Sequence, residues 1–166
     1  MTAKTSAAGG TRQHETRTVV DNRQARHLFF IEDTFEAGIM LQGWEVKAIL
    51  AGQANFNGGS AFVRIIDGEA FLDALTVTPL KQAVRGAFIE LEPVRLRKLL
   101  LNKSELNKII RRKDEKGYTI VPLSITYNGK LKVNIGLAKG KKQHDKRDTI
   151  KERDVTRALA RDLRAA

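Results

Sequence analysis

The stretch YTIVPLSITYNGKLKVNIGL, residues 118–137, holds two apolar runs separated by Asn128-Gly129. In the second run, apolar side chains occupy every second position from 131 to 137, and positions 130, 132 and 134 between them are polar. This alternation predicts a strand with one buried and one exposed face. Asn-Gly between two such runs favours a tight hairpin, because both residues tolerate positive φ. Pro122 indicates an edge strand or a bulge within the first run.

The rest of the chain between residues 28 and 101 carries further strand patterns. SAFVRIIDGEAFLDALTV, residues 60–77, places Asp67-Gly68 between two apolar runs and predicts a second hairpin. LFFIEDTFEAGIML, residues 28–41, alternates from position 35 onward and predicts a half-buried strand. LRKLLL, residues 96–101, is short and apolar enough for one more strand.

Two short helices are predicted beside these strands. Asn102 with Glu105 is typical of an N-cap and its capping-box partner, so a helix is expected over 103–116 with Gly117 ending it. GWEVKAILAG suits a helix closed by Gly52. The sequence is therefore mainly β, and short strands joined by tight turns favour a closed antiparallel barrel with helical plugs. An α+β sheet is the alternative.

Both ends of the chain lack this periodicity. Residues 1–21 are predicted to be a disordered leader, residues 22–138 the folded domain, and residues 139–166 a basic tail that is disordered when free. The tail carries ten basic and five acidic side chains, which makes it the most densely positive part of a chain whose net charge is +11. Such an excess favours a polyanionic partner, and nucleic acid comes first.

Composition narrows the class of protein further. The chain has no cysteine, which excludes disulfides and thiolate chemistry. No apolar run approaches the roughly 18–20 residues of a spanning helix, and the first residues contain no apolar signal region. We therefore expect a cytoplasmic monomer that does not bind membranes.

The residues needed for catalysis or metal binding do not form a recognisable pattern. His14, His27 and His144 are far apart, and the sequence has no zinc-ligand spacing. GLAKGKK, residues 136–142, has three residues between its glycines where a phosphate-binding loop needs four. The acidic residues at 32, 33 and 36 would alternate between the faces of a strand and are interpreted as a solvated rim. We expect no enzyme activity, no metal and no cofactor.

Four segments resemble the SsrA-binding protein family, SmpB: FFIEDTFEAGIMLQGWEVKAI, RKLLLNKSEL, GYTIVPL and IGLAKGKKQHDKRDTIKERD. The resemblance covers roughly residues 22–154. It implies an OB-like antiparallel barrel with short flanking helices that binds the tRNA-like part of transfer-messenger RNA. It further implies a non-enzymatic adaptor in trans-translation, which brings that RNA to a stalled ribosome so that the unfinished peptide is tagged.

The resemblance also assigns residues. Its RNA-binding positions correspond to Glu36, Leu100, Asn102 and Lys132. Its ribosome-binding tail, placed in the decoding region of the small subunit and the mRNA path, corresponds to Lys139, Gly140, Lys141, Lys142, His144, Asp145, Lys146 and Arg147. Without the resemblance, Glu36 would be an ordinary exposed carboxylate, Asn102 a helix cap and Leu100 as much a core residue as a functional one.

Three positions depart from the family pattern: Gln53, Phe62 and Glu92. Two other functions stay open on the residues alone. A cold-shock-like barrel for single-stranded RNA would stack bases on exposed aromatic residues, yet aromatic residues make up only 6% of this chain. A nuclease or RNA-modifying enzyme would need an acid–base or metal constellation.

Overall fold

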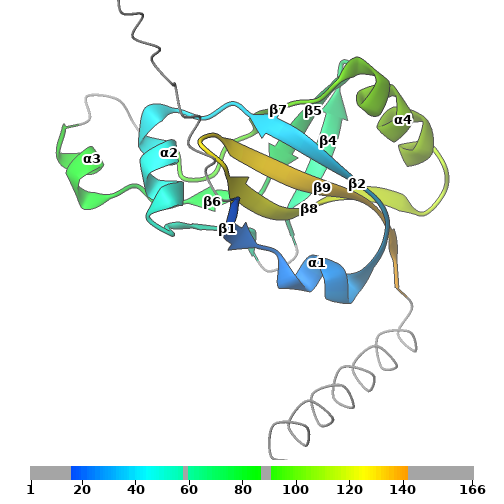
Figure 1. Cartoon of the computed structure of the whole chain (residues 1–166), viewed down its shortest axis with the longest axis horizontal. Helices are drawn as coiled ribbons and strands as arrows, with labels where there is room; N and C mark the ends of the chain where they lie inside the picture. The colour runs from blue at the N-terminus through cyan, green and yellow to red at the C-terminus, as the bar shows by residue number, and fades with distance from the viewer. Residues whose placement is uncertain (1–15, 58–59, 87–90, 142–166) are drawn as a thin grey trace, which may run out of the picture.

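The computed structural model describes residues 16–57, 60–86 and 91–141, without the side chains of residues 85 and 86. Seven antiparallel strands form one sheet in the order β1-β8-β9-β2-β7-β5-β4 (Figure 1). Their bounds are Arg17–Asp21 (β1), Phe29–Ile39 (β2), Phe62–Ile66 (β4), Glu69–Asp73 (β5), Arg97–Leu100 (β7), Tyr118–Tyr127 (β8) and Leu131–Gly140 (β9). A separate two-stranded sheet joins β3, Ala54–Asn55, to β6, Thr76–Val77. The helices are Arg23–Leu28 (α1), Gly43–Leu50 (α2), Lys81–Gly86 (α3) and Lys103–Lys113 (α4).

The β8–β9 hairpin forms as predicted. Its pairing runs from Tyr127 opposite Leu131 to Tyr118 opposite Lys139. The turn holds Asn128 and Gly129, and the glycine has φ of 70°. The register shifts just after Pro122, so the proline lies at a bulge. β8 pairs with β9 on one edge and with β1 on part of the other, and β9 pairs in turn with β2, so both strands of this hairpin lie inside the sheet.

The second predicted hairpin is also confirmed. β4 and β5 pair from Ile66 opposite Glu69, and Asp67 and Gly68 have φ of 51° and 76°. Positive φ at both central residues is the geometry that favours Asp-Gly at a tight turn. Sequence alone located this turn because its geometry depends on only two residues.

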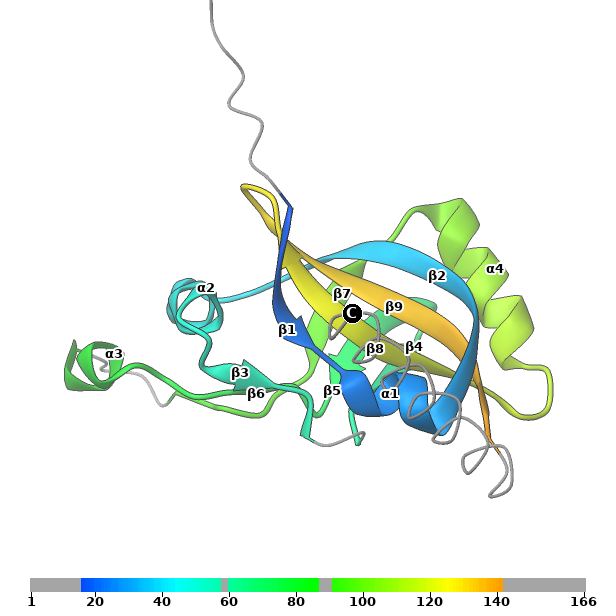
Figure 2. The same ribbon diagram turned by 60° about the horizontal axis from the view of Figure 1, so that its bottom comes forward.

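The mainly antiparallel β architecture is confirmed, whereas closure of the sheet remains a prediction. The sheet curves strongly (Figure 2), and β4 lies near β8. Within the described residues, however, the order of hydrogen-bonded strands ends at β1 on one side and β4 on the other. The helices lie around the sheet: α4 buries Ile109 fully at one end, and α2 buries Ala48 and Ile49 toward the other.

The predicted leader and tail boundaries need correction. Residues 17–21, placed in a disordered leader, form β1 and pair with β8 from Ser124 to Tyr127. Val20 is buried by this pairing. At the other end β9 continues through Gly140, so Lys139 lies opposite Phe30 and not in a tail. Both strand ends gain their hydrogen bonds from segments about a hundred residues away, which no local pattern reveals.

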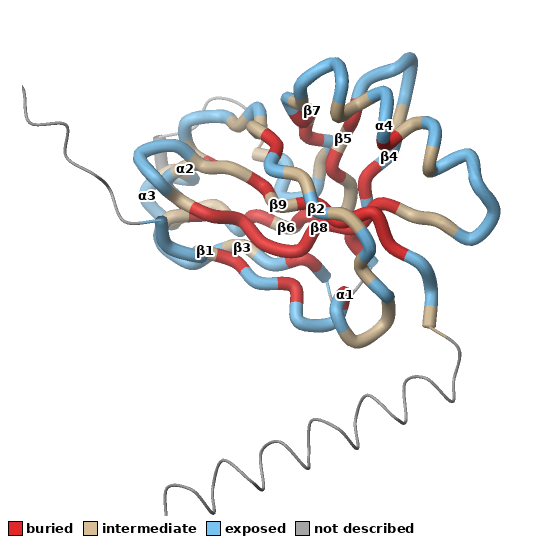
Figure 3. Tube along the Cα trace, turned by 45° about the vertical axis from the view of Figure 1, so that its right-hand side comes forward, coloured by how far each residue is buried: buried red, intermediate tan, exposed pale blue. Residues whose placement is uncertain are grey.

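Each of the seven strands of the large sheet contributes buried residues to the main hydrophobic core, together with α2 and α4 (Figure 3). Every residue of β8 from Ile120 to Thr126 is buried. The reason is a second, smaller apolar cluster, in which Ala25 of α1 covers Val121, Leu123 and Ala138. β8 is therefore covered on both faces in this part. None of the helices in the described part of the chain is long and apolar enough to cross a membrane.

Candidate nucleic-acid interface

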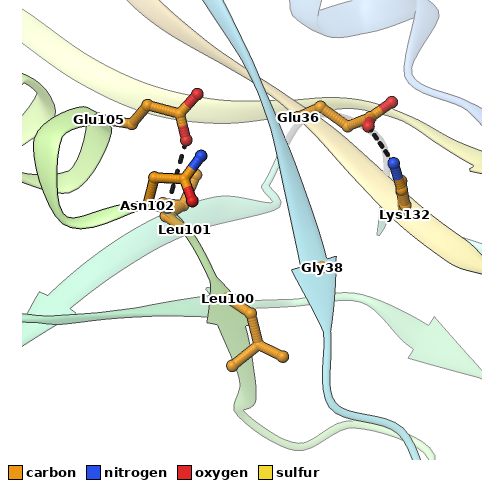
Figure 4. A pocket seen from close by; sticks show the side chains of 7 residues that line it. All are labelled: Glu36, Gly38, Leu100, Leu101, Asn102, Glu105 and Lys132. Atoms are coloured by element: carbon orange, nitrogen blue, oxygen red, sulfur yellow. Dashed lines mark hydrogen bonds and ion pairs between the residues drawn. The ribbon is translucent and has the colours of Figure 1, made fainter.

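An open groove of about 330 Å³ lies where β2, β7, β9 and the start of α4 meet (Figure 4). Glu36 of β2, Lys132 of β9, Leu100 of β7 and Asn102 before α4 all line it. These are the four residues that the sequence assigned to RNA binding. The remaining lining residues are Gly38, Leu101 and Glu105. The structure thus brings together four side chains that are up to 96 residues apart in sequence.

Gly38 explains why these strands meet here. In the ladder it pairs with Leu100 of β7 on one side and with Lys132 of β9 on the other. A Cβ at this position would lie 3.2 Å from Cβ of Leu100, which is tighter than most real contacts. The absence of a side chain therefore leaves the groove floor open and lets Leu100 lie directly beside β2.

The polar side of the groove is an ion pair. Lys132 Nζ donates to Glu36 Oε1 at 2.5 Å, and both side chains are about half exposed, at 45% and 49%. An exposed pair of this kind contributes little to folding, typically ~0–1 kcal/mol. Its ammonium group is a donor for phosphate, and its carboxylate accepts hydrogen bonds only. The pair can therefore exchange partners with a ligand at small cost to the fold.

The apolar side of the groove is Leu100, whose side chain is 51% exposed. Its neighbour Leu99 is 3% exposed and packs in the core. The sequence left core packing and function open for Leu100, and the alternation of β7 places it on the surface. A half-exposed leucine beside a cationic pair suits apolar contact with a bound ligand.

Asn102 precedes α4 at the end of the groove. Its backbone N–H donates to Glu105 Oε2 at 3.3 Å, as expected for a capping box. Capping and groove lining are therefore compatible at this position. α4 itself ends at Lys113, three residues before the predicted end, and Gly117 beyond it has φ of 90°.

The three predicted tail residues that the structure describes lie away from the groove. Lys132 and Lys139 are seven residues apart on β9, which corresponds to roughly 23 Å of strand. Lys139 Nζ lies 5.8 Å from the ring centre of Tyr118, and Lys141 Nζ lies 4.8 Å from that of Phe30. Gly140 ends β9 between them. Lys142, His144, Asp145, Lys146 and Arg147 lie outside the described residues.

Sequence reasoning missed Tyr118, which contacts several charged groups at this far end of β9. Its hydroxyl donates to the Glu32 carboxylate at 2.9 Å, and this hydrogen bond raises the pKa of Tyr118. Arg112 lies 6.0 Å from the ring centre. The only signal in the sequence was an aromatic residue at the start of a strand, which is also typical of core packing.

The acidic residues at 32, 33 and 36 each have a cationic neighbour of their own. Asp33 pairs with Lys108 at 3.3 Å, and Glu32 lies 3.8 Å from Arg112. Glu36 pairs with Lys132 as described. Among the described residues, no group of three or more His, Cys, Asp or Glu side chains is placed to hold a metal ion.

Sequence comparison relates this chain to proteins of known kind. The profile of the family described as "SmpB protein" matches residues 19–165. The SsrA-binding protein of Roseiflexus sp. (strain RS-1) is 50% identical over 149 residues, covering 89% of this chain and 92% of the relative. The SsrA-binding protein of Roseiflexus castenholzii (strain DSM 13941 / HLO8) is 47% identical over 149 residues, with the same coverage of both chains.

A solved structure agrees with the sequence comparison. It is described as "tmRNA-SmpB: a journey to the center of the bacterial ribosome". The similarity has a TM-score of 0.61 and 43% sequence identity, and it covers 76% of this chain and 87% of the other. From the match of the profile over most of its length and from these relatives, the chain belongs to the SmpB protein family.

Proposed function

We propose that this chain is a non-enzymatic adaptor that binds the tRNA-like part of transfer-messenger RNA and delivers it to stalled ribosomes. The single observation that carries the proposal is the convergence of Glu36, Leu100, Asn102 and Lys132 on one groove. Membership of the SmpB family supports it, because its relatives are named for binding SsrA RNA and one is described on the ribosome.

The groove would recognise RNA through three kinds of contact. Lys132 binds a phosphate, which positions the RNA without reading its sequence. Glu36 accepts from a base amino group, or from a ribose hydroxyl, once Lys132 has moved to the phosphate. Leu100 and Asn102 contact the same nucleotides from the other wall. Recognition by shape and backbone agrees with a folded RNA ligand.

The far end of β9 and the residues beyond it would act on the ribosome. Lys139, Gly140 and Lys141 begin this basic segment, and Lys142, His144, Asp145, Lys146 and Arg147 continue it in the sequence. We assign residues up to 141 to the RNA-binding domain and residues 142–166 to a tail that contacts the decoding region and the mRNA path. This work would take place in the cytoplasm, where ribosomes are.

The finer description of the fold belongs to the same proposal. We infer that the sheet closes between β4 and β8 into an OB-like barrel, because β4 lies near β8 while β1 covers only the Ser124–Tyr127 part of its edge. OB folds bind nucleic acids on one face of such a barrel. The groove described above lies on the outer surface of β2 and β9.

A gel-shift competition tests the proposal. The full chain is bound to a labelled transcript of the tRNA-like part of transfer-messenger RNA, and unlabelled transcript competes with an unstructured RNA of equal length. We expect the folded transcript to compete at much lower concentration. Equal competition by both RNAs would favour a general single-stranded RNA-binding protein and would contradict the proposed adaptor.

A further inference from the structure

A second groove, of about 470 Å³, lies beside the first, between α2 and the β8–β9 hairpin. Figure 1 shows this helix and the hairpin tip on the same side of the molecule. The walls of this second groove are mostly aliphatic. Leu41, Val46 and Leu50 line one side, and Leu131 with Tyr127 line the other. All five are only half-buried, so the groove exposes apolar surface.

The packing of α2 explains why this apolar surface remains open. The helix turns Glu45, Ala48 and Ile49 into the protein, where all three are fully buried. Val46 and Leu50 are four residues apart on the same helix, so their side chains are neighbours and form a second apolar stripe. This stripe lines the groove and lies outside the main hydrophobic core cluster. An apolar recess of this kind marks a binding site more often than a packing fault.

The recess is continuous with the polar groove. Gly38, Leu100 and Lys132 line both of them. Lys130 and Lys132 lie along the rim, and Arg17 stands 5.7 Å from the ring centre of Tyr127. An occupant must therefore have an apolar, compact part for the recess and negative charge at its edge, next to the phosphate contact of Lys132.

We propose that the recess receives one unstacked nucleobase from a loop of the bound RNA, an inference that rests on the proposed function. The base would pack between the aliphatic side chains of α2 and Leu131, with Tyr127 beside its face. Lys130 and Lys132 would hold the phosphates on either side. RNA loops offer such splayed bases, and proteins recognise them by burying the base and binding the neighbouring backbone.

The test combines a protein variant with removal of single bases. Val46→Gln replaces an apolar wall of the recess by a polar one, and Val84→Gln makes the same change at a 59% exposed valine of α3. Binding of both variants and of the unchanged chain is measured on a synthetic tRNA-like RNA and on copies with single abasic nucleotides in its loops. Leu50→Gln repeats the test from the next turn of α2.

One abasic position should weaken binding of the unchanged chain on the order of tenfold. Val46→Gln should weaken binding of intact RNA to a similar degree and show little further loss at that position, since both changes remove one interaction. Val84→Gln should behave like the unchanged chain. Thermal unfolding of each variant shows whether a loss of binding follows from loss of fold.

Two results would overturn the inference. If Val46→Gln and Leu50→Gln are folded and bind the RNA normally, no base occupies the recess, and a protein partner becomes the better candidate. If the losses from abasic positions and from Val46→Gln simply add, the base lies elsewhere. Failure of the unchanged chain to prefer the tRNA-like RNA would instead contradict the proposed function itself.

Discussion

At the scale of single residues, neighbouring side chains of β7 have opposite environments. Leu99 is 3% exposed and contacts the core, whereas Leu100 is 51% exposed and lines the groove. Strand geometry requires this alternation, because successive side chains point to opposite faces. The two leucines therefore form a matched pair, in which the same substitution separates a structural from a functional effect.

We predict that Leu99→Ala lowers the free energy of unfolding by about 2–5 kcal/mol, since it opens a cavity in the core. Leu100→Ala should change stability by less than about 1 kcal/mol and should weaken binding of the tRNA-like RNA. Urea denaturation and gel shifts measure the two effects. Strong destabilisation by Leu100→Ala would show that Leu100 supports the fold and would remove the case for a functional leucine.

Another residue-scale feature is a buried ion pair that the sequence did not reveal. Glu45 of α2 and Arg97 of β7 are both fully buried, and Arg97 Nε donates to Glu45 Oε1 at 2.9 Å. Arg97 also donates to the carbonyl oxygens of Leu75 and Pro93, at 2.6 and 3.2 Å. Arg95 adds two hydrogen bonds to the same carboxylate, at 3.0 and 2.5 Å. This network ties α2 to the strand that leads into the groove.

The pKa values of Glu45 and Arg97 depend on their burial and on the charges and hydrogen bonds of their neighbours. Burial raises the pKa of Glu45, but the hydrogen bonds from Arg95 and the Gln42 backbone, with the charge of Arg97, outweigh it and leave the pKa lowered. Burial also lowers the pKa of Arg97. Arginine still keeps its proton at neutral pH. Glu45 is therefore ionised in the folded protein and contributes stability above the ordinary pKa of about 4.5, which is lost as the pH falls below it.

We predict that Glu45→Gln lowers the free energy of unfolding by about 3–5 kcal/mol near neutral pH, because it leaves two arginines without their counter-charge. The difference from the unchanged chain should shrink as the pH falls below the ordinary glutamate pKa of about 4.5, toward the lowered pKa of Glu45 in the folded protein. Glu69→Gln is the matched control, since that carboxylate is 48% exposed and pairs with Lys98 on the surface. A difference that stays constant with pH would contradict an ionised Glu45.

At the scale of elements, β1 and α1 attach to the fold through one asparagine. Asn22 lies between them and is 4% exposed. Its side chain accepts from Ala25 N at 3.1 Å, which caps α1, and donates to the carbonyl oxygen of Pro122 at 2.8 Å. Its backbone N–H donates to Leu123 O at 2.8 Å. Asn22, at the expected border of a disordered leader, thus supplies hydrogen bonds both to the start of α1 and to the bulge of β8.

Deletion of residues 1–21 should therefore destabilise the protein, whereas deletion of residues 1–15 should not. The longer deletion removes β1, exposes the Ser124–Tyr127 edge of β8 and loses the burial of Val20, which alone is worth about 2 kcal/mol. Thermal unfolding of the two shortened chains measures the difference. Equal stability of both would mean that β1 contributes nothing to the fold in solution.

At the scale of the whole molecule, positive charge is found at both ends of β9. Lys132 lies in the groove, and Lys139 and Lys141 lie roughly seven to nine residues farther along, next to Tyr118 and Phe30. One strand thus connects the proposed contact with transfer-messenger RNA to the start of the proposed ribosome-binding tail. The two functions should be separable by changes at either end.

A chain that stops after Lys141 should bind the tRNA-like RNA as the full chain does but should fail to support peptide tagging in a reconstituted translation assay. The end point follows from the structure, because Lys141 N donates to Leu28 O at 2.9 Å and closes the last pairing of β9. If the shortened chain loses RNA binding, the tail takes part in binding transfer-messenger RNA, and RNA binding and action on the ribosome are not separable.

Salt dependence tests the charge of the groove. Affinity for the RNA should fall with rising salt, and Lys132→Ala should reduce the slope of log K against log salt by about one unit if Lys132 binds one phosphate. Lys81→Ala removes the same charge from the exposed part of α3 and should leave the slope unchanged. An unchanged slope for Lys132→Ala would place the phosphate contact elsewhere.

The sequence by itself determined the features that depend on neighbouring residues. Asp67-Gly68 and Asn128-Gly129 located the hairpins because a tight turn needs positive φ at particular positions. Asn102 with Glu105 located the start of α4 for a similarly local reason. The family motifs supplied Glu36, Leu100, Asn102 and Lys132 as candidates, but not their arrangement.

Only the tertiary structure decided what depends on distant partners. β1 forms because β8 offers it an edge, and Asn22 meets Pro122 across a hundred residues. Leu100 can lie directly beside β2 because Gly38, which reaches it only through strand pairing, has no side chain there. Glu45 and Arg97 are tolerated in the core because each neutralises the other. Such contacts gain free energy only when the whole sheet assembles, so no window of the sequence contains the information that selects them.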